Sequence, residues 1–337
     1  MRLIILGFGT VGRSFFTIAK EKAEWLRIRH GLTPQVVAVV DRGGAMISET
    51  GIELNEALAA KSGGSVACHK TLGNKGMSAL EVINGVEADV VLELTSTKLP
   101  DGEPALTHIE SAIKKGLNVV TTNKGPLAVA MPALLELAQY EEVQLRFSGT
   151  VGGGTPFLDF AKRCLIGDRI ESMRGILNGT TNYILTRMFD NGITIEEALR
   201  EAQKAGYAEA DPSYDISGLD TASKLVIMCN WVMERRVAIG DVHVEGISDV
   251  SIQDVERAKR NRKAVKLVGY VNDSEISVHP HSISLDEPLC VTGTLNAVTF
   301  RTELAGDITV TGRGAGGKET ASAVLRDLID IKRTLLK

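Results

Sequence analysis

The sequence predicts two domains, an α/β domain with a doubly wound parallel sheet followed by an α+β domain. The 337 residues exceed the length of a typical single domain. Short apolar runs alternate with helical patterns up to residue 147, which is typical of a parallel sheet. Beyond residue 265 the segments alternate in a way that favours antiparallel strands. We therefore place the first domain at residues 1–150, completed by residues 308–337, and the second at residues 151–307.

The chain begins with a predicted strand at residues 2–6, and a glycine-rich turn follows it directly. A helical pattern at 13–29 and an apolar strand at 36–40 come next, and Asp41 ends that strand. This is the order of a Rossmann-type dinucleotide site, in which glycines let the backbone approach the pyrophosphate and the acid meets the adenosine ribose. The turn consists of Gly7, Phe8, Gly9, Thr10, Val11 and Gly12.

Two adjacent residues leave the choice of dinucleotide open. Asp41 favours NAD, because a carboxylate accepts hydrogen bonds from the ribose hydroxyls. Arg42 stands beside it and could neutralise the 2′-phosphate of NADP. The sequence therefore predicts NADP or NAD as the cofactor and does not decide between them.

Two later strands end in polar residues, at the edge where open α/β sheets bind their ligands. The strand at 90–94 leads into Thr95 and Ser96, and the strand at 118–121 leads toward Lys124. We therefore favour a role for Lys124 toward a ligand over that of an ordinary surface lysine. The other segments of this domain are predicted as loop at 43–76 with a short helix at 55–61, helices at 105–115 and 132–140, and a strand at 144–147.

Glycine-rich segments lie at both ends of the second domain. The segment SGTVGGGTP, residues 148–156, can present its backbone to a ligand or an ion, or it can be a flexible linker. The segment GRGAGG, residues 312–317, precedes a predicted helix at 320–336. It can bind an anion at the helix N-terminus, or it can only fold the end of the chain back.

Within the second domain, the composition changes after residue 168. Its predicted elements are a strand at 169–177, a tight polar turn at 178–182, helices at 183–189 and 194–204, and antiparallel strands within 266–284 and 289–304.

The stretch GYAEADPSYDISGLDTASK, residues 206–224, carries more potential chemistry than any other. A helical pattern starts at Asp220, so Asp220 and Lys224 share one helix face. One interpretation is an exposed ion pair, worth at most about 0.5 kcal/mol. The other is a lysine on a largely apolar helix, held by acids for binding or proton transfer. The charged groups are Glu209, Asp211, Asp215, Asp220 and Lys224.

Composition narrows the class of protein. The net charge of −4, with both signs interspersed, argues against a nucleic-acid partner and favours a small-molecule substrate. No apolar run approaches the roughly 18 residues of a membrane span, so we expect no membrane association and a cytoplasmic protein. The cysteines form no Cys-x-x-Cys pair, and three of them lie in apolar or strand-like surroundings, so buried structural thiols are predicted. The four cysteines are Cys68, Cys164, Cys229 and Cys290.

Taken together, the motifs resemble those of the homoserine dehydrogenase family, nearly from end to end. They are GFGTVG, TTNKGPLA, SGTVGGGTP, ILNGTTNYIL, AGYAEADPSYDISGLDTASKL and GRGAGGKETASAVLRDL. The resemblance implies NAD(P)-linked interconversion of L-homoserine and L-aspartate 4-semialdehyde. It also implies a Rossmann domain joined to a substrate domain that forms a homodimer.

The resemblance assigns roles to individual residues. Lys224 becomes the general acid/base, and Lys124 a second lysine near the reacting oxygen. Both suit the chemistry, because a lysine can stabilise the charge on an aldehyde oxygen and supply its proton. The implied substrate residues are Glu209, Asp220, Asp215, Gly179, Thr180 and Tyr207. The implied cofactor contacts are Thr10, Val11, Thr95, Ser96, Lys124 and Gly316.

The family's sodium site maps onto backbone carbonyls of the junction segment. Some members carry glutamate where Ser148 stands, a change that main-chain ligation can survive. The chain ends at Lys337, so regulation by threonine through a C-terminal ACT domain is not expected. The implied sodium ligands are the carbonyls of Ser148, Val151, Gly153 and Thr155.

The alternatives to this family are other enzymes and a nucleotide-binding protein without activity. Another amino-acid dehydrogenase with a similar first domain, such as an aspartate dehydrogenase, is the alternative enzyme. An aspartate-semialdehyde dehydrogenase is disfavoured, because no cysteine has the setting of a nucleophile. A nucleotide sensor without activity has no need for both Lys124 and Lys224 to face one cleft.

Overall fold

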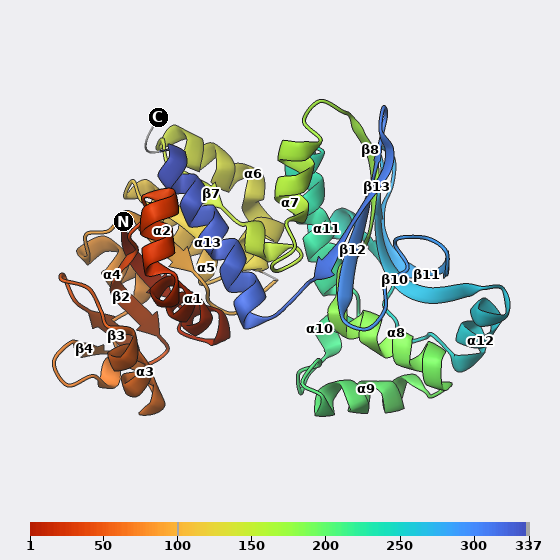
Figure 1. The fold of residues 1–337 in the computed structure, drawn as a ribbon, viewed down its shortest axis with the longest axis horizontal. Helices are drawn as coiled ribbons and strands as arrows, with labels where there is room; N and C mark the ends of the chain where they lie inside the picture. Colours follow the sequence, from red (N-terminus) through yellow and green to blue (C-terminus); the bar gives the residue numbers. More distant parts are fainter. Residues whose placement is uncertain (100, 335–337) are drawn as a thin grey trace. The chain divides into compact units, whose positions relative to one another are not determined.

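The computed structural model describes residues 1–99 and 101–334, and these form two compact units (Figure 1). Unit 1 contains Met1–Thr150 and Gly316–Lys337, and unit 2 contains Val151–Ala315. Residues 308–315 were expected in the first domain but belong to unit 2, because most of them continue a strand of its sheet. Among the described residues, no helix is both long and apolar enough to cross a membrane.

Unit 1 is built on a seven-stranded sheet in the order β4-β3-β2-β1-β5-β6-β7. The five strands from β2 to β7 in this order run parallel, which confirms the predicted doubly wound sheet. Their residues are almost all buried, as is typical of a parallel sheet covered on both faces. The strands are β1 (Arg2–Leu6), β2 (Gln35–Asp41), β3 (Gly44–Ile47), β4 (Gly73–Lys75), β5 (Val90–Glu93), β6 (Asn118–Thr121) and β7 (Leu145–Arg146).

Helices cover both faces of this sheet. One face packs its apolar side chains against α1, α2, α3 and α13, and α1 lies beside α13 (Figure 1). Helices α4, α5 and α6 also contact strands of this sheet. The helices are α1 (Thr10–Glu21), α2 (Ala23–His30), α3 (Leu54–Ser62), α4 (Ala79–Gly85), α5 (Ala105–Lys114), α6 (Lys124–Tyr140) and α13 (Gly317–Thr334). The last two residues of the helix predicted at 320–336 lie outside the described residues.

The prediction of loop at 43–76 was wrong in two places, where the antiparallel strands β3 and β4 form. Gly44 explains the close pairing, since its φ is +135° and a Cβ there would lie 2.2 Å from the Asn74 carbonyl oxygen. Strands of three or four residues give too short an alternation to stand out in a glycine-rich segment.

Unit 2 is built on a six-stranded sheet in the order β13-β12-β8-β10-β11-β9. Its central pairs are antiparallel, which confirms the predicted α+β class. The strands are β8 (Ile170–Ile176), β9 (His243–Val244), β10 (Lys263–Val271), β11 (Ile276–Ser284), β12 (Leu295–Thr302) and β13 (Gly306–Arg313).

Helices α8, α11 and α12 pack against β10, and α9 packs against α8 (Figure 1). The predicted polar turn at 178–182 is instead the first turn of α8, because Asn178 caps the helix by accepting from the Thr181 amide. The helices of unit 2 are α7 (Phe157–Asp159), α8 (Gly179–Asn191), α9 (Ile195–Lys204), α10 (Ser213–Ile216), α11 (Leu219–Val232) and α12 (Ile252–Arg260).

Candidate active site

The glycine turn after β1 has the backbone that a bound diphosphate requires. Gly7 has φ +93°, and a Cβ there would lie 2.6 Å from the Leu94 carbonyl oxygen. A Cβ on Gly12 would lie 2.3 Å from the Gly7 carbonyl oxygen, so α1 can pack this closely only with glycine. Gly9 instead faces open space, and no side chain caps α1. The first amides of α1 can therefore face an anion.

The C-terminal glycine segment enters α13 next to the start of α1. A Cβ on Gly317 would lie 2.8 Å from Thr10 Cγ2 and 2.6 Å from Ser14 Oγ. Gly316 precedes it with φ +127°, a conformation that favours glycine. The structure therefore brings Gly316 and Thr10, both predicted cofactor contacts, to one end of unit 1.

Asp41, predicted to meet the ribose, is engaged by four donors of its own unit. Oδ1 accepts from the Gly43 amide and the Ser65 hydroxyl, at 2.9 and 2.5 Å. Oδ2 accepts from Lys61 Nζ and the Val66 amide, at 2.6 and 3.1 Å. Burial opposes ionisation of this carboxyl, but these hydrogen bonds outweigh it and lower its pKa.

Arg42 follows Asp41 in the turn between β2 and β3, where it is exposed. Lys61 lies close by, since its ammonium pairs with Asp41 at 2.6 Å. This end of unit 1 therefore presents two cations around one ionised carboxylate.

The ends of β5 and β6 are joined by polar contacts. Asn123 caps α6, and its amide also donates to the carbonyls of Thr95 and Ser96, at 3.3 Å each. Lys124 is the first residue of α6, and its backbone amide lies 3.4 Å from Thr97 Oγ1. The backbone of α6 is non-helical at Ala130, so the helix predicted at 132–140 corresponds to the part of α6 after that interruption. Lys124 begins the part before it, at the carboxyl end of the sheet.

In unit 2, two acids, a lysine and an amide form a buried cluster. Lys224 Nζ donates to Asp220 Oδ2 at 2.7 Å and to the Leu177 carbonyl at 2.6 Å. The Asn178 amide donates to Asp220 Oδ2 at 2.8 Å and to Asp215 Oδ1 at 2.6 Å. Asp220 and Lys224 are 5 and 7% exposed. The interpretation of this pair as an exposed ion pair was therefore wrong.

Burial controls the ionisation of this cluster. It raises the pKa of Asp215, and the neighbouring charge of Asp220 adds to that increase, while bonds from Asn178 and Thr180 oppose it. Burial also raises the pKa of Tyr214, whose hydroxyl lies 2.8 Å from Ser223 Oγ.

The remaining predicted substrate residues lie at or near the N-terminus of α8. Thr180 Oγ1, next to Gly179 in its first turn, donates to the Tyr207 carbonyl at 2.8 Å. Tyr207 is 49% exposed, and its ring lies 4.9 Å from that of Tyr183. Glu209 is exposed on the following loop, and within the described part of the chain no bond joins its carboxylate to the buried cluster.

The four residues of the predicted sodium site fall in the junction segment. Ser148, in unit 1, donates its amide and hydroxyl to Asp327, at 3.0 and 2.5 Å. In unit 2, the Thr155 hydroxyl donates to the Arg313 carbonyl at 3.1 Å. Gly153 follows Val151 and Gly152 with φ +53°. No group of three or more His, Cys, Asp or Glu suited to a metal ion occurs in residues 1–99 and 101–334.

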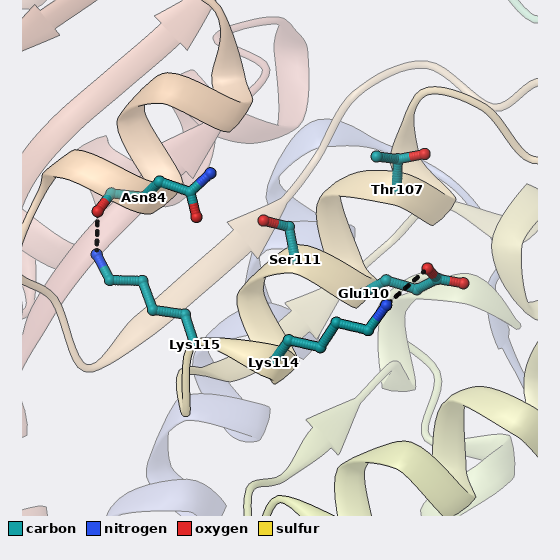
Figure 2. Close-up of a pocket in the computed structure, with 6 residues that line it drawn as sticks. All are labelled: Asn84, Thr107, Glu110, Ser111, Lys114 and Lys115. Carbon is teal, nitrogen blue, oxygen red and sulfur yellow. Dashed lines mark hydrogen bonds and ion pairs between the residues drawn. The ribbon is translucent and has the colours of Figure 1, made fainter.

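A shallow hollow of about 390 Å³ lies along α4 and α5 (Figure 2). Its lysines are engaged in structural contacts. Lys115 Nζ donates to the carbonyls of Ile83, Asn84 and Val86 at the end of α4, and Lys114 pairs with Glu110 at 3.6 Å. None of the predicted site residues lines this hollow, and we assign no ligand to it.

Sequence reasoning missed several polar residues around these sites. Asn178 caps α8 where a polar turn was predicted, and Asn123 caps α6 in the polar segment after β6. An asparagine before a helical pattern is itself a helix-start signal. Glu93 and His108, a buried pair at the end of β5, had no such signal, because one lies within an apolar strand and the other on the inner face of a helix.

Two family models match the chain. The model described as "Homoserine dehydrogenase" matches residues 156–329, and that described as "Homoserine dehydrogenase, NAD binding domain" matches residues 7–148. The second range contains the glycine turn and the ends of β5 and β6. The first contains the buried cluster of acids and lysine.

Similar proteins agree with the family models. A homoserine dehydrogenase from Methanocaldococcus jannaschii is 43% identical, with 100% of each chain covered. An NAD(+)-dependent homoserine dehydrogenase from Pseudomonas canavaninivorans is 38% identical, over 99% of this chain and 96% of the relative. The solved structure of a homoserine dehydrogenase from Thiobacillus denitrificans has a TM-score of 0.87 at 33% identity, covering 100% of this chain and 74% of that one. A hyperthermophilic archaeal homoserine dehydrogenase in complex with NADPH has a TM-score of 0.87 at 31% identity, covering 99 and 98%.

The Rossmann-type sheet, its glycine turn and the matching NAD-binding model define an NAD(P)-dependent oxidoreductase. The two family models together match nearly the whole length of both units. The chain therefore belongs to the homoserine dehydrogenase family.

Proposed function

We propose that this chain catalyses the NAD(P)-dependent interconversion of L-homoserine and L-aspartate 4-semialdehyde. One observation carries the proposal: Lys224 is buried on α11 with Asp220 and Asp215 around it, in the unit that the family's substrate-domain model matches. A buried lysine held by directed hydrogen bonds is placed for proton transfer rather than for solubility.

Lys224 is proposed as the general acid/base, assisted by Lys124. When bound, the nicotinamide supplies or accepts the hydride. In the direction of aldehyde reduction, Lys224 donates a proton to the oxygen that gains charge, and in the other direction it removes a proton from the substrate hydroxyl. The contacts of its Nζ with Asp220 and the Leu177 carbonyl fix the direction from which it can do so.

The acids are proposed to bind the ammonium group of the amino-acid substrate. An ammonium needs charged acceptors, and Asp215 and Asp220 lie within reach of one donor, the Asn178 amide. Glu209, exposed on the loop between α9 and α10, would complete this set when substrate is bound. Gly179, Thr180 and Tyr207 are proposed to line the same site from the start of α8.

The cofactor is proposed to bind unit 1 at the glycine turn and the neighbouring strand ends. The open space at Gly9 supports the pyrophosphate position, and the cations Arg42 and Lys61 support an NADP 2′-phosphate next to Asp41. The proposed contacts are Gly7, Phe8, Gly9, Thr10, Val11, Gly12, Asp41, Arg42, Thr95, Ser96, Lys124 and Gly316.

We also propose a sodium ion on the backbone carbonyls of Ser148, Val151, Gly153 and Thr155. The positive φ angles of Gly152 and Gly153, +79° and +53°, support a turn that can direct carbonyls to a cation. Sodium chloride should then raise the thermal unfolding midpoint above that in choline chloride at equal ionic strength. Equal midpoints would argue against the site.

A homodimer in the cytoplasm completes the proposal. Ile166 and Leu304, 85 and 78% exposed in adjoining loops of unit 2, support an apolar contact with a second copy. Light scattering should give twice the chain mass of 36.1 kDa, and a mass of 36.1 kDa would exclude the dimer. Cys68 and Cys164 were predicted to be buried but are exposed. Exposed free thiols suit a reducing compartment, and a cell-fractionation experiment tests this location.

The deciding experiment follows homoserine-dependent reduction of NAD and of NADP by absorbance, for the chain and for Lys224→Ala. We expect turnover in the chain and a loss of at least about a thousandfold in kcat for the variant, with cofactor binding retained. Undiminished kcat in Lys224→Ala would remove Lys224 from its role. Cofactor binding without turnover in the unaltered chain would mean that the substrate is another amino acid.

A further inference from the structure

Glu93 and His108 form a buried polar contact at the end of β5, outside the residues given roles above. Glu93 is 0% exposed on β5 and His108 is 8% exposed on α5. His108 Nδ1 lies 2.7 Å from Glu93 Oε2. A carboxylate in such a place has a large desolvation cost, and an apolar side chain would serve a sheet core at least as well. Packing alone therefore does not account for it.

The other oxygen of Glu93 fixes Thr95, the residue proposed to contact the cofactor. Glu93 Oε1 accepts from the Thr95 amide at 2.9 Å and also from the Thr95 hydroxyl. Because a carboxylate only accepts, the hydroxyl hydrogen of Thr95 points to Glu93. Thr95 Oγ1 can then act toward a ligand only as an acceptor.

Asn123, the N-cap residue of α6, keeps this hydroxyl in the same orientation. Its Nδ2 donates to Thr95 Oγ1 at 3.3 Å, while its Oδ1 accepts from the Gly125 amide at 3.0 Å, which fixes the amide orientation. A hydroxyl oxygen has two acceptor positions, and Asn123 uses one. The second remains for a donor of the ligand, and Thr95 is only partly buried, so a ligand can reach it.

We propose that Glu93 and His108 are positioning residues that make Thr95 Oγ1 the acceptor for the carboxamide N–H of the nicotinamide. This inference rests on the proposed placement of the nicotinamide end at the C-terminal edge of β5. The carboxamide is the part of that end of the cofactor that carries N–H donors. His108 holds Glu93 from α5, Glu93 holds Thr95, and Thr95 selects the carboxamide.

The probe is the 3-acetylpyridine analogue of NADP, whose methyl ketone cannot donate a hydrogen bond. Dissociation constants for NADP and for the analogue are measured by titration calorimetry, and their ratio reports on the N–H contact. We expect NADP to bind the unaltered chain about five- to tenfold more tightly than the analogue. Thr95→Val should bring the ratio close to one, while Thr95→Ser should keep it.

The role of Glu93 is tested with two variants, Glu93→Leu and Glu93→Met, and the flexible methionine side chain fills the same space. If one variant does not fold, the other still gives the result. Both should bring the ratio close to one, and adding Thr95→Val should change it no further, because the two residues act through one contact. Glu93→Gln should keep the ratio, since an amide oxygen still accepts from Thr95. A ratio unchanged in Glu93→Leu or Glu93→Met, or additive effects with Thr95→Val, would overturn the inference.

Asn118→Ala is the matched control, because Asn118 is a buried polar residue at the opposite end of β6. Its side chain bonds to the Asp89 carbonyl and the Gln144 amide. Asn118→Ala should lower stability and leave the ratio of the two dissociation constants unchanged. A change in that ratio would show that any damage to the sheet alters it, and would overturn the inference. Equal affinity of the unaltered chain for both dinucleotides would also overturn it, but would leave the proposed cofactor binding intact. No binding of NADP or NAD would overturn both.

Discussion

At the scale of single residues, the structure changes the interpretation of Asp41. In the sequence it is the acid that meets the adenosine ribose, which favours NAD. In the structure four donors already surround its carboxylate, and one of them is Lys61. Asp41 therefore organises the turn that carries Arg42, the cation proposed to meet the 2′-phosphate of NADP.

Arg42→Ala should therefore weaken NADP binding about fivefold to tenfold and NAD binding less than twofold. The reason is that the 2′-phosphate loses a charge-assisted partner, while the ribose hydroxyls of NAD do not depend on one. Dissociation constants measured at fixed ionic strength check this. Arg29→Ala, which removes another exposed arginine of unit 1, controls for overall charge. Equal losses for NADP and NAD in Arg42→Ala would contradict the assignment.

At the scale of elements, the first turn of α8 joins helix capping to the proposed active site. One end of the Asn178 side chain caps α8 through the Thr181 amide, and the other end donates to Asp215 and Asp220. The start of the helix and the spacing of two carboxylates thus depend on a single amide. This joint role explains why an asparagine, and not serine or threonine, suits the position.

Asn178→Ala should lower the free energy of unfolding by about 1 kcal/mol through the lost cap and lower kcat/KM by about tenfold or more. Asn178→Ser should recover the stability, because serine caps helices well, but not the activity, because it cannot bridge both acids. Thr194→Ala removes the capping box of α9 in the same unit and should affect stability alone. Urea unfolding and steady-state kinetics check these outcomes. Full activity in Asn178→Ser would show that the cap alone matters.

The start of α8 also shows which features of the fold the sequence could predict and which it could not. Apolar strands and the glycine turn identified the parallel sheet of unit 1, because buried strands and positive φ angles have direct signatures. The polar segment after β8 was predicted as a turn, but Asn178 begins α8 there. The contact between Glu93 and His108 could not be predicted, since it joins residues 15 positions apart through the tertiary fold. Nor could the neutralisation of Asp41 by Lys61, which lies on another helix.

At the scale of the whole molecule, a buried lysine lowers the free energy of unfolding. Lys266 lies on β10 and is 2% exposed, and its Nζ bonds to Asn182 Oδ1 and Thr186 Oγ1, at 2.8 and 3.2 Å. Both of these partners are neutral. Burial lowers the pKa of Lys266 from 10.5 to about 8, and the charges of Cys290 and Asp190 oppose this decrease only in part.

Because the folded pKa of Lys266 lies below its unfolded value, the unfolded chain binds more protons between about pH 8 and pH 10.5. Stability contributed by this residue therefore rises with pH across that window, and is lowest below pH 8, where the folded protein must bury the ammonium. The shift corresponds to about 3 kcal/mol. We expect the free energy of unfolding of the chain, minus that of Lys266→Met, to increase by a large part of that amount between pH 7.5 and pH 10.5.

The measurement can be confined to unit 2, because each unit contains one tryptophan. Trp25→Phe leaves Trp231, at the end of α11, as the fluorescence probe of urea unfolding. Cys290→Ala in both proteins removes the neighbouring thiol, whose own pKa is raised by burial and which would titrate in the same range. Lys263→Met, an exposed lysine on the same strand, should give a difference that does not change with pH. A flat difference for Lys266→Met as well would mean that Lys266 stays protonated in the folded protein throughout, and that Asn182 and Thr186 compensate the buried charge in full.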